Sequence, residues 1–150
     1  MRSCCLLPIA FALSGCVASP AEPGPAAPAV RVLQVTLPVS DVEHAARFYA
    51  RLLGRPGERV GPGRHDFPCG EAVLACLDPR SAGQGRDARP LVEPVWLEVD
   101  DIEAAFARAR GAGCASLDRE LARLTTGRRL FRLEDPFGNP LCVVEGAQPR

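Results

Sequence analysis

Two twelve-residue stretches, VTLPVSDVEHAA at residues 35–46 and VWLEVDDIEAAF at residues 95–106, decide the fold of this 150-residue chain. They lie 60 residues apart and agree in register at six positions. Such agreement indicates an internal repeat. The identical pairs are Val35/Val95, Leu37/Leu97, Val39/Val99, Asp41/Asp101, Glu43/Glu103 and Ala45/Ala105. The chain therefore holds two copies of one structural unit.

Each copy predicts a strand followed by a helix. The Val-x-Leu-x-Val pattern alternates with a period of two, as in a strand with one apolar face. Ser40 and Asp100 stand where the helix N-caps are expected, with acidic residues next. Gly54 is expected to end the first helix, and Gly111 or Gly113 the second. The apolar helical positions are Val42, Ala45, Ala46, Tyr49, Leu52, Leu53, Ile102, Ala105, Phe106 and Ala109.

More strands follow each helix. After the first helix, a Cys69-Gly70 turn precedes a strand at residues 71–77. After the second, strands at 130–134 and 141–145 flank the turn DPFGN at 135–139. Each half therefore reads βαβββ, although the second strand of each half leaves little trace in the sequence. Residues 79–90 form a polar link between the halves.

The N-terminal region reads as a targeting segment. Residues 1–16, MRSCCLLPIAFALSGC, give a short charged start and an apolar stretch, as in a signal peptide. The sequence Leu13-Ser14-Gly15-Cys16 resembles a lipobox, which predicts lipidation of Cys16 and anchoring in the cell envelope. Residues 17–31 form a Pro/Ala-rich linker, 32–146 the folded domain and 147–150 a tail. The alternative is a misassigned start codon, with a cytoplasmic protein that begins near Val30.

Composition excludes some functions. The 18 basic residues, all arginine, balance 18 acidic ones, which argues against nucleic-acid binding by a basic surface. No apolar run reaches the length of a membrane-spanning helix.

The predicted domain holds four cysteines without a CxxC pair, so a structural zinc site is not indicated. They are Cys69, Cys76, Cys114 and Cys142. Their even number permits disulfides, but small buried thiols are the simpler interpretation.

The segments VTLPVSDVEHAARFYARLLG, PVWLEVDDIEAAF and LEDPFGNPLCVVE resemble the vicinal oxygen chelate superfamily. That superfamily contains glyoxalase I, bleomycin-resistance proteins and extradiol dioxygenases. The resemblance covers residues 32–146 and implies an α+β fold. Its two βαβββ modules would form an open, cup-like mixed sheet, a half-barrel, with helices on the outer face. It also implies a homodimer, because single-domain members usually pair.

Strand alternation assigns side chains to the two faces of this cup. Val35, Leu37 and Val39 are expected under the first helix, and Leu97 in the corresponding core of the second half. The remaining strand residues would face the cup. They are Gln34, Thr36, Pro38, Val73, Ala75, Leu77, Pro94, Trp96, Glu98, Pro140, Cys142 and Val144.

The resemblance also places four metal-ligand positions at Gln34, Ala75, Pro94 and Cys142. Ala75 and Pro94 have no side-chain donor, and a thiolate departs from the family's oxygen and imidazole ligands. We therefore expect no metal cofactor. His44 on a solvated helix face and His65 near a turn do not supply a histidine-based centre.

Two functions remain. The first is metal-free binding of a small organic molecule, as in the drug-sequestering, bleomycin-resistance-like branch. Its ligand-binding residues would be Gln34, Thr36, Trp96, Glu98 and Cys142. The alternative is a glyoxalase-like lyase or a dioxygenase with a non-standard metal arrangement or a metal-free site. Glu98 as a base or Cys142 as a nucleophile would then be catalytic. We expect binding rather than catalysis, and the sequence does not identify the ligand.

Overall fold

The computed structural model describes residues 31–147, which lie within one compact unit. The predicted signal peptide, Cys16 and nearly all of the linker lie outside the described residues. So do residues 148–150, which are most of the predicted tail. Within residues 31–147, no helix combines the length and hydrophobicity that crossing a membrane requires.

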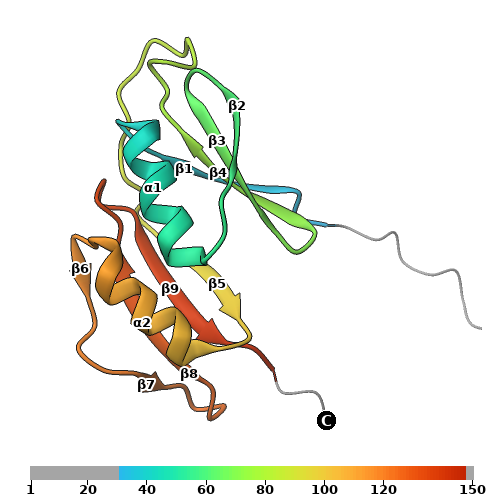
Figure 1. Cartoon of the computed structure of the whole chain (residues 1–150), viewed down its shortest axis with the longest axis vertical. Coiled ribbons are helices and arrows are strands. Elements are labelled where there is room, and N and C mark those ends of the chain that lie inside the picture. Colours follow the sequence, from blue (N-terminus) through green and yellow to red (C-terminus); the bar gives the residue numbers. More distant parts are fainter. Residues whose placement is uncertain (1–30, 148–150) are drawn as a thin grey trace, which may run out of the picture. The chain divides into compact units, whose positions relative to one another are not determined.

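The first module has the predicted order of elements (Figure 1). Strand β1 (Gln34–Pro38) leads into helix α1 (Val42–Leu53). Strands β2 (Glu58–Gly61), β3 (Arg64–Cys69) and β4 (Ala72–Leu77) follow. The sheet order is β1-β4-β3-β2, with β1 parallel to β4 and the other pairs antiparallel. This is the predicted βαβββ unit.

The second module repeats this plan with one change. Strand β5 (Val95–Val99), helix α2 (Ile102–Ala112), β8 (Arg129–Glu134) and β9 (Pro140–Glu145) match the first module. In place of one second strand, β6 (Ser116–Leu117) and β7 (Ala122–Arg123) both pair with β8. The sheet order is β5-β9-β8-β6, and β5 is parallel to β9. The expected α+β fold of two βαβββ modules with an open, mixed strand arrangement is confirmed, and the strands form two sheets.

The N-caps of both helices differ from the prediction by one residue. Asp41 and Asp101, not Ser40 and Asp100, are the N-caps. Asp41 accepts from the backbone N–H of His44 at 2.9 Å, and Asp101 makes the same contact with Ala104. An aspartate satisfies an orphan N–H of the first turn and carries a charge that suits the helix dipole.

Gly54 and Gly113 end the helices as predicted. Both adopt the left-handed conformation, with φ of 68° and 90°. In this region glycine avoids the steric cost of a Cβ atom.

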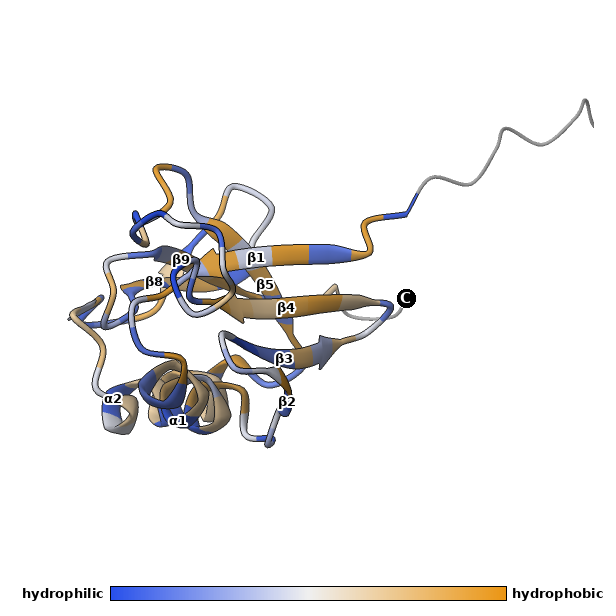
Figure 2. Cartoon of the chain, turned by 90° about the horizontal axis from the view of Figure 1, so that it is seen from above, coloured by the Kyte–Doolittle hydropathy of each residue, from blue (hydrophilic) through white to orange (hydrophobic). Residues whose placement is uncertain are grey.

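Both helices lie on the same side of the strands and share one core with them (Figure 2). Leu37 and Val39 are fully buried there, which confirms the face assigned to them. Val35 and Leu97 are only half-buried at the edge of this core. We predicted that Leu97 fills the core, but its side chain is only partly buried. Leu97 instead lines a cavity beside β5.

A buried polar network joins the two modules. The side chains of Asp135 and Asn139, from the turn between β8 and β9, are fully buried. Tyr49 of α1 donates its hydroxyl to Asp135 Oδ2 at 2.7 Å. Asn139 donates to the same Oδ2 and to the carbonyl of Pro38, and its Oδ1 accepts from the N–H of Leu91. This turn thus connects α1, β1 and the inter-module link. These hydrogen bonds explain why the turn carries an aspartate and an asparagine.

Candidate ligand-binding site

On the face away from the helices, the first sheet carries a polar cluster around Ala75. Thr36, Ala75 and Asp66 are paired across β1, β4 and β3. Gln34 donates to Thr36 Oγ1 at 2.8 Å, and Arg64 donates to Gln34 Oε1 at 2.7 Å. Arg64 also makes two contacts of 2.7 Å with the Asp66 carboxylate. The amide of Gln34 is therefore engaged at both ends.

The same face of the second sheet is more apolar. Cys142 and Val144 of β9 pack with Leu130 of β8 and with Leu124, which lies just after β7. Cys142 is 1% exposed, although its neighbour across the strands, Trp96, is 56% exposed. The segment that carries Leu124 thus covers part of the face expected to be open.

The four family metal positions do not fit a divalent ion. Ala75 and Pro94 have no donor atom. The oxygen of Gln34 already accepts from a guanidinium, whose charge repels a cation. Burial raises the pKa of the Cys142 thiol, which disfavours the thiolate that binds metal. Among residues 31–147, no other group of three or more His, Cys, Asp or Glu side chains is placed to hold a metal.

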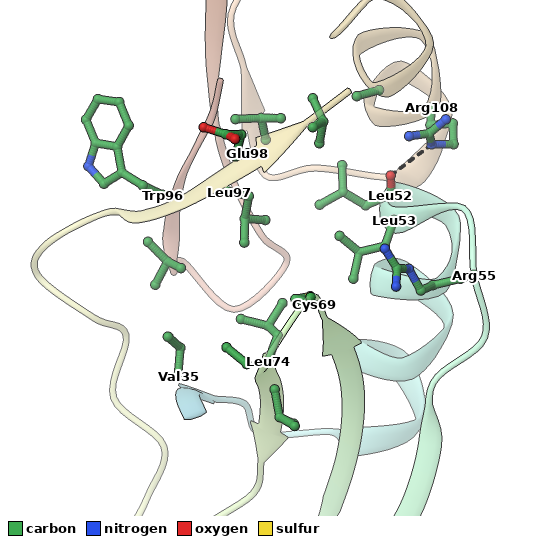
Figure 3. Close-up of a pocket in the computed structure, with 17 residues that line it drawn as sticks. Val35, Leu52, Leu53, Arg55, Cys69, Leu74, Trp96, Leu97, Glu98 and Arg108 are labelled. Carbon is green, nitrogen blue, oxygen red and sulfur yellow. Dashed lines mark hydrogen bonds between the residues drawn. The ribbon is translucent and has the colours of Figure 1, made fainter. Parts of the chain in front are cut away.

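A cavity of about 400 Å³ lies at the free edge of β5 (Figure 3). We call it the inter-sheet cavity, because its lining comes from β1, from the β3–β4 turn and β4, and from β5 and β9. The C-terminal end of α1, the following Arg55 and one face of α2 complete it. Its walls are mainly apolar, and they include Leu52, Leu53, Leu74, Val95, Leu97 and Val99. Its size falls in the range of small-molecule sites.

Three charged side chains line this cavity, at its two ends. Arg55 and Arg108 lie together at one end, and Glu98 lies near Trp96 at the other, with the indole directed away from the interior (Figure 3). Glu98 forms an ion pair with Arg128. Cys69, half-buried in the wall, has a pKa that burial raises and that the charge of Arg55 lowers in part.

The structure brings together some of the predicted ligand residues. Trp96 and Glu98 line the inter-sheet cavity, whereas Gln34 and Thr36 belong to the polar cluster on the first sheet. Cys142 lies in the buried cluster of the second. Sequence reasoning missed Arg55 and Arg108. The only signals were that Arg55 follows the glycine that ends α1 and that Arg108 flanks the apolar stripe of α2.

The two side chains predicted as catalytic, Glu98 and Cys142, lie in different surroundings. Glu98 is exposed and held by Arg128, and Cys142 is a buried thiol with a raised pKa. In the described part of the chain, neither histidine lines the cavity. The thiols of Cys69, Cys76, Cys114 and Cys142 are free. The site offers an apolar space with charged ends.

Comparison with known proteins agrees with the resemblance seen in the sequence. The family model described as Glyoxalase/Bleomycin resistance protein/Dioxygenase superfamily matches residues 31–143. A search of curated proteins gave no match.

Several solved structures share the fold at low identity. A glyoxalase/bleomycin resistance protein from Albidiferax ferrireducens T118 is 20% identical with a TM-score of 0.65, covering 76% of this chain and 97% of its own. A lactoylglutathione lyase from Agrobacterium tumefaciens is 21% identical with a TM-score of 0.61, covering 79% and 96%. A superfamily member from Sphaerobacter thermophilus DSM 20745 is 24% identical with a TM-score of 0.60, covering 79% and 98%. At these identities the likeness establishes the fold alone.

Proposed function

The chain belongs to the Glyoxalase/Bleomycin resistance protein/Dioxygenase superfamily, and within it we propose that this protein binds a small organic molecule without a metal ion. The proposed site is the inter-sheet cavity together with the faces of the sheets beside it. The observation that carries the proposal is the mainly apolar cavity of about 400 Å³ beside Trp96 and Glu98. Apolar walls with a few polar groups at the ends are typical of ligand pockets.

The chemistry of the family metal positions supports the metal-free part of the proposal. Two of the four positions, Ala75 and Pro94, cannot ligate at all. A third, Gln34, donates to Thr36 and accepts from Arg64. An ion held by so few ligands would bind weakly. The function is thus closer to sequestration of a ligand, as in the bleomycin-resistance branch, than to a metal-dependent lyase or dioxygenase.

Two further features complete the proposal. We propose a homodimer, since β5 is an edge strand and Trp96 and Val92 are largely exposed near it. We also propose that lipidation of Cys16 anchors the domain in the cell envelope through the linker at 17–31. The anchoring proposal rests on the sequence, and the homodimer rests on the family resemblance and on these exposed residues beside β5.

Titration of the EDTA-treated chain with 8-anilino-1-naphthalenesulfonate (ANS) tests the proposal. We expect saturable binding in the absence of metal. Val73→Trp, which places a large side chain in the cavity wall, should weaken binding at least about tenfold. Val60→Trp is the matched control, because Val60 is exposed on β2 and does not line the cavity. Binding that needs added metal, or that Val73→Trp leaves unchanged, would contradict the proposal.

A further inference from the structure

We propose that the ligand of the inter-sheet cavity is an amphipathic anion, with its charged group held by Arg55 and Arg108 and its apolar part against β5. This inference rests on the proposed function, because it assigns the chemical class of the molecule bound at that site. It depends on three features: how each arginine is held, which partners each lacks, and how charge is distributed along the cavity.

Arg108 is held in place by the end of α1. Its Nε donates to the carbonyl of Leu52 at 3.0 Å, which orders the half-buried side chain. A Cβ atom on Gly54 would lie 3.3–3.5 Å from the Nε, Cδ and Cζ atoms of Arg108. Gly54 thus serves both the left-handed helix end and the close approach of this side chain. Among residues 31–147 no hydrogen bond engages the two terminal nitrogens of Arg108, which leaves both for a ligand.

Arg55 is held by strand β3. Its Nη1 donates to the carbonyl of Pro68 at 2.7 Å, near the end of β3. Its positive charge lowers the pKa of Cys69 against the effect of burial, so its field reaches the cavity wall. A guanidinium fixed through one nitrogen keeps further donors in its fork for a carboxylate, sulfonate or phosphate.

Within the described part of the chain, neither arginine has an acidic partner. Among residues 31–147, the ion pairs of the structure involve other arginines, and none joins Arg55 or Arg108 to a carboxylate. At the opposite end, the negative charge of Glu98 is balanced by Arg128. The cavity therefore carries an excess of positive charge at one end. Two guanidinium groups beside an apolar wall are complementary to an anion with an apolar body.

Two probes that differ only in charge test this inference on the purified chain. ANS carries a sulfonate, and N-phenyl-1-naphthylamine is the same aromatic body without it. Arg55→Gln/Arg108→Gln should weaken ANS binding at least about tenfold and leave the neutral probe unchanged. The control Arg47→Gln/Arg51→Gln removes two exposed charges of α1 outside the cavity and should leave both probes unchanged.

Competition identifies the anionic class. Octanoate and octyl phosphate should displace ANS at concentrations at which octanol does not, and whichever acts at the lower concentration shows whether a carboxylate or a phosphate is preferred. Because Arg108 also contacts Leu52, Arg55→Gln alone is measured too, with urea unfolding as the check on folding. Because Arg55 is exposed, Arg55→Gln should leave folding intact and by itself weaken ANS binding severalfold.

The outcomes separate the two proposals. The anion inference is overturned if the double arginine variant leaves ANS affinity unchanged, or if octanol competes as well as octanoate. The proposed function still stands in either case if the neutral probe binds the parent chain. If neither probe binds the parent chain, the proposed function fails as well.

Discussion

Replacement of Tyr49 by Phe tests the buried network that joins the modules. The change removes one hydroxyl, which donates to Asp135 Oδ2 at 2.7 Å in a site where both side chains are fully buried. Burial, and then the charge of Asp135, raise the pKa of Tyr49 well above its ordinary value, so the hydroxyl stays a donor. A hydrogen bond to a charged group contributes about 1.5–3 kcal/mol. We expect Tyr49→Phe to lower the free energy of unfolding by about 2 kcal/mol.

The measurement is urea unfolding followed by circular dichroism, with Tm as a second readout. For a chain of this size, about 2 kcal/mol corresponds to a fall in Tm of roughly 4–8 °C. The same substitution in an Asp135→Asn background is the control. Each oxygen of Asp135 accepts two hydrogen bonds, so asparagine removes the charge and replaces one acceptor by an NH2 donor. The cost of Tyr49→Phe should therefore fall to about 1 kcal/mol or less. An equal cost in both backgrounds, or a loss below about 0.5 kcal/mol, would refute the role of the charged acceptor.

Three other predictions follow from the site, the surface and the N-terminus. Trp96→Ala should cause little loss of stability in urea unfolding, because Trp96 is 56% exposed, whereas the buried Leu37→Ala should cost about 2–5 kcal/mol. Equal costs would mean that the faces are assigned backwards. Hydrogen bonds from Arg129 lower the pKa of Glu145 from its ordinary 4.5 to about 2. The stabilisation is therefore full above pH 4.5 and is lost as the pH falls toward 2, and Glu145→Gln should flatten the acid unfolding curve there. Cys16→Ser should abolish lipid attachment in membrane fractions analysed by mass spectrometry, and a parent chain without lipid would contradict the anchoring proposal.

Much of the fold was predictable because its signals are local. The repeat, both helices, the helix-ending glycine Gly54 and the buried face of Leu37 all follow from short-range periodicity and turn chemistry. Strand β2 left no such trace, because three of its four residues are exposed and none is buried. The N-cap assignment was one residue off, since Ser40 and Asp41 are both good caps and only the backbone geometry selects Asp41.

The site was predictable only in part, because it depends on contacts between distant segments. Trp96 and Glu98 came from strand alternation in the second repeat. The burial of Cys142 depends on the segment near Leu124 that folds over it. The role of Arg108 depends on the end of α1, 56 residues away in the chain. Sequence periodicity reports which face a residue occupies and does not report which distant side chains meet it.

Elemental analysis of the purified chain, combined with ANS titration before and after EDTA treatment, tests whether the cavity binds its ligand without a metal. We expect no stoichiometric divalent metal and the same ANS affinity in both samples. About one tightly bound Zn, Ni, Mn or Fe ion per chain, with ANS affinity lost on its removal, would contradict it.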